Sequence, residues 1–172
     1  MVAPFFFYKI LNVNYIFYLI SLLIIFVLIK LLIMIQKTFS VTTKAISKEQ
    51  IWKLMSNVDE WKNWDTSVEN SKLKGNFESG SGFLFKPKGG PNVNIKLVEV
   101  KPDVYFKDET VFPLAKMNGE HWYEETPDGL KITTTMTMTG ALAFLWNKIV
   151  MKDIVANLES DIHLQIKNAS KN

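Results

Sequence analysis

The hydrophobic period of the sequence changes once, after Gly140, and this change constrains the fold more than any other feature. Before it, apolar and polar residues alternate in short runs, as in half-buried strands. After it, apolar residues recur at steps of three and four, with one irregular step near Lys152, as on one face of a long helix. That face must be buried, and a preceding sheet can bury it. The helical positions are Leu142, Leu145, Ile149, Val155, Leu158, Ile162 and Ile166.

Turn signals rich in Gly, Pro, Asn and Asp divide the alternating region into strands of an antiparallel meander. Two short helices are expected after the first strand. Ser47 and Gln50 match a capping box that begins one, and NVDEWKNWD (57–65) predicts the other, with Trp61 and Trp64 one turn apart. The fold class is therefore α+β. The expected strands are Thr38–Ala45, Glu69–Leu73, Gly82–Lys86, Val93–Val100, Val104–Phe112, Lys116–Glu125 and Leu130–Thr139.

Alternation also predicts which strand residues face the helix. In the last strand one parity is apolar apart from Thr134, while the other carries Lys131 and several threonines. The same argument turns His121 and Tyr123 inward if Glu120 and Glu124 face water. The inward set is Phe83, Phe85, Val93, Ile95, Leu97, Met117, His121, Tyr123, Leu130, Ile132, Thr134, Met136 and Met138.

The first part of the chain differs from the rest in composition. Tyr15 to Ile35 is apolar except for Ser21 and Lys30, which is long enough for a helix across a hydrocarbon core of ~30 Å. We expect residues 1–36 to be an uncleaved, single-pass anchor, with 37–168 as the globular domain and 169–172 as a short tail. More lysines follow the segment than precede it, which favours a cytoplasmic domain. Alternatively, translation begins at Met34 and the protein is soluble in the cytoplasm.

Composition excludes several classes of function. The sequence has no cysteine and no arginine, so zinc–thiolate sites and bidentate arginine clamps for phosphate cannot form. Lys9 and Lys30 precede residue 36, which leaves 18 of the 20 lysines against 17 acids. This near balance argues against a nucleic-acid partner. With two distant histidines, His121 and His163, we expect no metal and no cofactor.

Several stretches together resemble a known family. FSVTTKAISKEQIWKLMSNVDEWKNWD, GSGFLFKPKGG, EHWYEETPDG and MTMTGALAFLWNKI look like the START-like (SRPBCC) superfamily, in particular its polyketide cyclase/dehydrase and lipid-transport branch. The resemblance covers about Thr38 to Ile166 and leaves out the amino-terminal segment. It implies a helix-grip fold, in which a curved antiparallel sheet wraps around the carboxy-terminal helix and the short helices close one end of an apolar cavity.

The resemblance turns the inward residues into candidate cavity residues. Trp61 and Trp64 would cap the cavity and hold the short helices to the sheet, a mainly structural role. His121 is either a hydrogen-bonded histidine of the sheet or a general acid or base acting with Tyr123. The predicted lining is Trp61, Trp64, Phe83, Phe85, Val93, Ile95, Leu97, Met117, His121, Tyr123, Met136, Met138, Leu145 and Ile149.

Two functions follow as hypotheses. The favoured one is binding or transfer of a hydrophobic small molecule or lipid at the membrane. The alternative is a cyclase or dehydratase reaction in which His121 and Tyr123 act on a polyketide-like substrate. A protein-interaction role for the same groove is a weaker third hypothesis.

Overall fold

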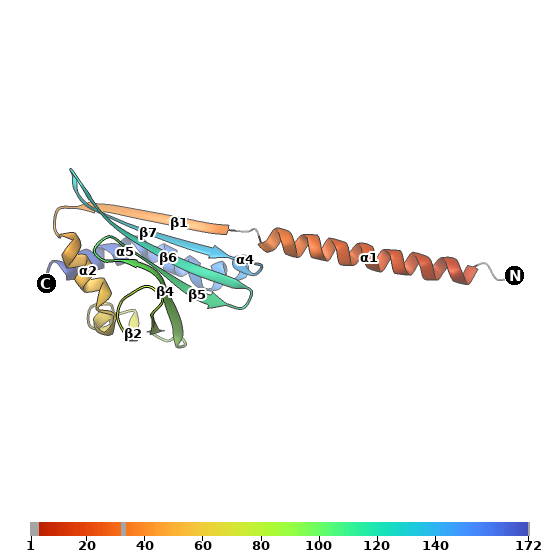
Figure 1. Ribbon diagram of the computed structural model, residues 1–172, viewed down its shortest axis with the longest axis horizontal. Helices are drawn as coiled ribbons and strands as arrows, with labels where there is room; N and C mark the ends of the chain where they lie inside the picture. The colour runs from red at the N-terminus through yellow and green to blue at the C-terminus, as the bar shows by residue number, and fades with distance from the viewer. Residues whose placement is uncertain (1–3, 32–33, 172) are drawn as a thin grey trace.

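The computed structural model describes residues 4–31 and 34–171, with side chains for 13–26, 28 and 34–171. Helix α1 (Pro4–Leu31) extends away from the rest of the molecule, which is a sheet with helices on one side (Figure 1). The remaining elements are β1 (Met34–Thr43), α2 (Lys48–Ser56), η1 (Val58–Glu60), α3 (Trp61–Trp64), β2 (Val68–Lys74), β3 (Gly82–Pro87), β4 (Val93–Lys101), β5 (Tyr105–Phe112), β6 (Ala115–Thr126), β7 (Gly129–Thr139), α4 (Ala143–Trp146), η2 (Asn147–Met151) and α5 (Lys152–Ala169).

The sheet is antiparallel, and its seven strands lie in the order β1-β7-β6-β5-β4-β3-β2. β2 to β7 form the predicted meander, and β1 pairs with β7, so the first and last strands are neighbours. The curved sheet with one long helix across it confirms the predicted α+β helix-grip architecture (Figure 1).

The core lies between α5 and the face of the sheet that α5 covers, here called the inner face. On β7 the predicted parity holds, since Leu130, Ile132 and Met138 are at most 5% exposed. Ile162 of α5 packs into the same cluster as Ile132 and Phe106. A second cluster nearer α4 joins Leu158 to methionines of β6 and β7. The apolar faces that the strand alternation and the helical period predict therefore pack against each other in one layer.

Helix α2 begins as predicted. The Ser47 hydroxyl accepts a hydrogen bond from the Gln50 backbone, and the Gln50 side chain accepts one from the Ser47 backbone. This capping box satisfies two amide groups that would otherwise lack partners in the first turn. Ile51, Leu54 and Met55 are buried, so the helix closes one end of the core.

The carboxy-terminal helix contains a π-helical turn, Asn147–Met151, which explains the irregular step near Lys152. A π turn holds one residue more than an α turn, so it rotates the helix face. The prediction that Leu145 and Ile149 face the sheet is wrong for this reason. They are 45% and 54% exposed, whereas Met151 is 0% exposed in the core.

The amino-terminal prediction needs correction at its end. Met34 and Ile35 were expected in the apolar helix, but they lie in β1, paired with Thr139 and Met138. Residues 32–33 and the side chains of Lys9 and Lys30 lie outside what the structure describes. Among the described residues, no helix combines the length and the apolar character needed to cross a bilayer.

Candidate functional site

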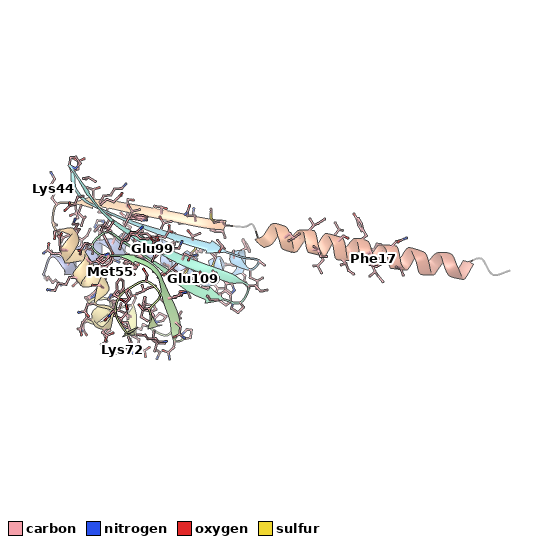
Figure 2. All side chains as sticks on the ribbon, in the orientation of Figure 1. Phe17, Lys44, Met55, Lys72, Glu99 and Glu109 are labelled. Carbon is pink, nitrogen blue, oxygen red and sulfur yellow. The ribbon has the colours of Figure 1, made fainter. Side chains whose placement is uncertain are left out.

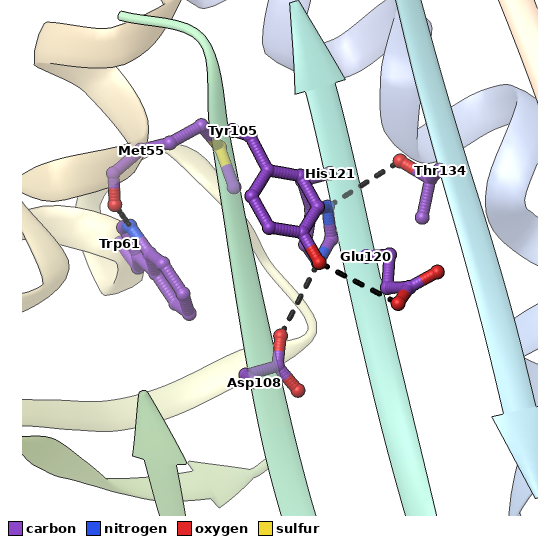
Figure 3. A network of polar contacts seen from close by, with 7 residues as sticks. All are labelled: Met55, Trp61, Tyr105, Asp108, Glu120, His121 and Thr134. Carbon is purple, nitrogen blue, oxygen red and sulfur yellow. Dashed lines mark hydrogen bonds and ion pairs between the residues drawn. The ribbon is translucent and has the colours of Figure 1, made fainter. Parts of the chain in front are cut away.

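A cluster of polar side chains lies on the inner face of the sheet, across three neighbouring strands. His121 of β6 is between Asp108 of β5 and Thr134 of β7 (Figure 3). Its Nε2 lies 3.3 Å from Asp108 Oδ2, and its Nδ1 lies 3.4 Å from Thr134 Oγ1. We call Asp108, His121 and Thr134 the polar trio.

The register of the strands brings the trio together. His121 is directly opposite Thr134 on β7 and Phe106 on β5, so the Asp108 carboxylate reaches it diagonally. Gly119 stands opposite Asp108 and has no side chain. A Cβ atom at Gly119 would lie 2.8 Å from Asp108 Oδ2 and 3.0 Å from His121 Nε2. Gly119 therefore provides the space in which the carboxylate and the imidazole meet.

Hydrogen bonding indicates which ring nitrogen of His121 carries the proton. A carboxylate only accepts hydrogen bonds, so Nε2 donates to Asp108. In the neutral ring Nδ1 then accepts from the Thr134 hydroxyl. The Phe106 ring stacks on the imidazole at 4.2 Å between centroids and covers one ring face. The imidazole is thus held at both nitrogens and on one face.

Tyr123 follows His121 on the same inner face and is 3% exposed. Its ring meets Trp52 edge-on at 6.2 Å. Its Oη atom is buried without a hydrogen-bond partner among the described residues. Burial raises the pKa of the Tyr123 hydroxyl far above its ordinary value, so this group stays a neutral donor.

The opposite face of the same strands carries a separate polar contact. Tyr105 Oη donates to Glu120 at 3.4 Å (Figure 3). Lys107 Nζ lies 2.9 Å from the same carboxylate. Burial, together with the Glu120 charge, raises the pKa of Tyr105 to about 12. This contact lies across the sheet from the trio and has no part in the inner face.

Apart from His121 and the two tryptophans, the predicted lining residues fall into three groups. One group is buried in the two core clusters, with Phe83, Leu97 and Tyr123 in the first and Met117, Met136 and Met138 in the second. Phe85, Val93 and Ile95 lie on the same face of β3 and β4 and are half-buried. Leu145 and Ile149 do not join them, as described above.

Trp61 fastens the short helices to the sheet. Its Nε1 donates to the Met55 carbonyl at 3.0 Å (Figure 3). Its ring meets Phe83 edge-on at 5.2 Å between centroids. Trp64 lies at the end of the domain, where it helps to line an open cleft of about 260 Å³. Its Nε1 is buried without a hydrogen-bond partner in the described part of the chain.

Sequence reasoning did not single out Asp108. The available signal was Gly119, because a glycine within a strand often marks a close approach of a neighbouring group. Within the described residues no three His, Asp or Glu side chains are grouped as metal ligands.

The sequence matches a protein-family model described as polyketide cyclase/dehydrase and lipid transport over residues 34–168. The match begins where β1 begins and ends in the last turn of α5. No curated relative matches the sequence.

Solved structures share the fold at low sequence identity. The crystal structure of Ara h 8.0201 has a TM-score of 0.66 at 14% identity, over 81% of this chain and 99% of that one. The di-domain ARO/CYC protein StfQ of the steffimycin biosynthetic pathway has a TM-score of 0.65 at 15% identity, over 80% and 51%. Norcoclaurine synthase from Thalictrum flavum, solved with dopamine and hydroxybenzaldehyde, has a TM-score of 0.59 at 14% identity, over 83% and 89%. At such identities the likeness concerns the fold alone.

Proposed function

Because the chain belongs to the polyketide cyclase/dehydrase and lipid transport family, we propose that it binds a hydrophobic small molecule on the inner face of its sheet. One observation carries this proposal. Asp108 and His121 keep 16% and 15% of their side-chain surface exposed, although they lie on the apolar inner face. A polar group that remains accessible within an apolar surface is the usual arrangement of a small-molecule site.

Part of the inner face lies outside the main contacts of the helical layer. α5 packs mainly against α2, β1 and β7. Phe85, Val93 and Ile95, farther along the inner face, remain half-buried. Burying ~200 Å² of apolar ligand surface against them contributes about 5 kcal/mol at ~25 cal/mol per Å², before the costs of association. A long apolar chain can therefore bind with little polar recognition.

The polar trio favours one chemistry at the ligand's polar end. Asp108 is an anionic acceptor, and the sequence has no arginine with which to pair a ligand carboxylate. A hydroxyl or amine can donate to Asp108, whereas a fatty-acid carboxylate would be repelled by it. The proposed ligand class is thus a long-chain or polycyclic alcohol or amine.

The alternative, acid–base catalysis by His121 and Tyr123, has less support. Both ring nitrogens of His121 already have partners within the protein, and Phe106 covers one ring face. The raised pKa of the buried Tyr123 hydroxyl keeps it protonated, so it is a weak acid and offers no phenolate to act as a base. Binding without turnover is therefore the function that this geometry favours.

The amino-terminal helix supplies the second part of the proposal, which is attachment to a membrane. The side chains of residues 13–26 of α1 are all exposed, and apart from Asn14 and Ser21 they are apolar. This run is about 21 Å long at about 1.5 Å per residue. We propose that it enters the hydrocarbon region and keeps the domain at the bilayer, on the cytoplasmic side that the lysine distribution favours.

Native mass spectrometry of the full chain, released from nanodiscs, tests the binding proposal. Dodecanol, dodecylamine and dodecanoate serve as probes of equal length. We expect the alcohol and the amine to be retained and dodecanoate to be lost. Asp108→Asn should weaken retention of the amine by about tenfold. Glu109→Gln, a matched change on the outer face, should leave it unchanged. Equal retention of all three probes by both variants would contradict an Asp108 site.

A further inference from the structure

Large apolar side chains are exposed at the end of the domain that adjoins α1. Leu114 is 70% exposed, Val111 66% and Met34 62%, and the displaced residues Leu145 and Ile149 belong to the same end. We call Met34, Val111, Leu114, Leu145 and Ile149 the apolar end. Exposed apolar residues scattered singly need no explanation, but a cluster at one end of a domain does.

Pairing and hydrogen bonds hold the segments of the apolar end together. Met34 and Lys116 both pair with Thr139, so the start of β1 and the β5–β6 turn lie at the same end of the sheet, on either side of β7. The Leu142 amide donates to the Leu114 carbonyl at 3.1 Å, which joins that turn to the start of α4. In addition, Trp146 Nε1 donates to the Pro113 carbonyl at 3.0 Å. These bonds hold the β5–β6 turn and the start of α4 together at the end of the domain where β1 begins.

Leu114 is unfavourable for folding in two ways. Its side chain is exposed, and its backbone has φ of 56°, in the left-handed region that glycine and asparagine tolerate better. A glycine at this turn would relieve the strain and remove exposed apolar surface. A strained, exposed leucine therefore indicates a function that requires its side chain.

The apolar end lies next to α1, and this position indicates what kind of partner it would contact. Three residue steps from Leu31 to Met34 span at most about 11 Å, so the end of α1 stays close to it. Lys148 and Lys152 are exposed three residues after Leu145 and Ile149, with Asp153 beside them. Lysines next to apolar side chains suit the boundary between hydrocarbon and anionic lipid headgroups.

We propose that the apolar end docks on the surface of the bilayer that holds α1, with Leu114 at its tip. This inference rests on the proposed membrane attachment of α1. Docking at this end stands the sheet on the bilayer, so that Lys44 at the far end of the domain points away from it (Figure 2).

Fluorescence quenching in vesicles tests the docking. Because the chain has no cysteine, a single cysteine carries one NBD fluorophore at a chosen position. Three full-length variants are reconstituted in vesicles of phosphatidylcholine and phosphatidylglycerol with doxyl-labelled lipid. They are Leu114→Cys in the apolar end, Phe17→Cys in α1 and Lys44→Cys at the far end. We expect strong quenching at positions 17 and 114 and none at position 44.

The other outcomes separate the two proposals. If position 17 is quenched and position 114 behaves like position 44, α1 is inserted and docking is overturned. If neither position is quenched, the membrane attachment fails, and docking fails with it. If position 114 is shielded without lipid, in a manner that depends on protein concentration, the surface is occupied by a second copy of the chain and docking on lipid is again overturned.

A second variant tests the role of Leu114 itself. Leu114→Gly relieves the positive φ, so we expect the thermal midpoint of unfolding to rise. In the same background, quenching of NBD at Ile149→Cys should fall by about twofold, because the tip of the docking surface is lost. Undiminished quenching would show that Leu114 does not contribute to docking.

Discussion

Gly119 and Asp108 face each other across β6 and β5, and the missing side chain of the glycine leaves space for the carboxylate of the aspartate. A Cβ atom at position 119 would come within 2.8 Å of Asp108 Oδ2. The contact between Asp108 and His121 therefore depends on Gly119, although Gly119 has no side chain with which to contact either residue. The absence of a side chain at Gly119 is therefore as necessary for this site as the polar side chains of Asp108 and His121.

The first prediction is that Gly119→Ala disrupts the polar trio while keeping the fold. The new methyl group must displace the Asp108 carboxylate, and we expect a loss of about 1–2 kcal/mol in the free energy of unfolding. Retention of dodecylamine should fall as it does for Asp108→Asn. Urea unfolding and native mass spectrometry measure the two effects. Asn118→Ala, on the outer face of the same strand, is the control and should not alter retention.

The second prediction concerns the orphan hydroxyl of Tyr123. Tyr123→Phe removes a buried group without a hydrogen-bond partner among the described residues, so we expect the free energy of unfolding of the ligand-free protein to rise by about 1 kcal/mol. A ligand that accepts a hydrogen bond from Oη would bind more weakly to this variant. Thermal unfolding with and without dodecanol separates these effects. Tyr105→Phe, which loses the outer-face bond to Glu120, should show no stabilisation.

The third prediction compares two tryptophans that sequence reasoning treated alike. Trp61→Phe keeps an aromatic ring but loses the 3.0 Å hydrogen bond to the Met55 carbonyl. Trp64→Phe removes an Nε1 that has no partner among the described residues. The first variant should therefore be less stable than the second by about 1 kcal/mol, as measured by urea unfolding. Equal stabilities would mean that the Trp61 bond contributes nothing measurable.

Much of the fold is predictable because it rests on periodicity. The alternation in 130–139 assigns Ile132 and Met138 to the inner face, and both are buried there. The capping box at Ser47 likewise depends on neighbours in the sequence, and α2 begins at Lys48. These features depend only on residues that are close together in the sequence, so the sequence pattern alone predicts them.

The remaining features depend on contacts between segments far apart in the sequence. Asp108 approaches His121 only because the β5–β6 register sets Gly119 opposite it. The π turn at Asn147–Met151 shifts the helical period, so that Met151 is buried in the core while Leu145 and Ile149 are exposed. Met34 and Ile35 read as apolar helix but pair with β7. Tertiary pairing overrides local hydropathy at these positions.

The fourth prediction concerns the dependence of stability on pH. Burial, with a smaller contribution from the nearby Asp65, raises the pKa of Asp161 on α5 from 3.8 to about 6. Between these pH values the folded protein binds more protons at Asp161 than the unfolded chain does. Its contribution to stability is therefore fully present below about pH 4 and is lost as pH rises through about 6.

Asp161→Asn removes this titration and keeps the shape of the side chain. The full shift would correspond to about 3 kcal/mol, but solvent screening at this half-exposed site reduces the expected gain at pH 7 to about 1 kcal/mol. Urea unfolding at pH 4, 5, 6 and 7 measures the free energy of unfolding. In the parent protein this free energy should decline as pH rises, and in the variant the decline should be much smaller. Asp153→Asn, an exposed position on the same helix, should leave the decline intact. An unchanged profile for Asp161→Asn would assign the decline to other groups, because no titration at position 161 would remain.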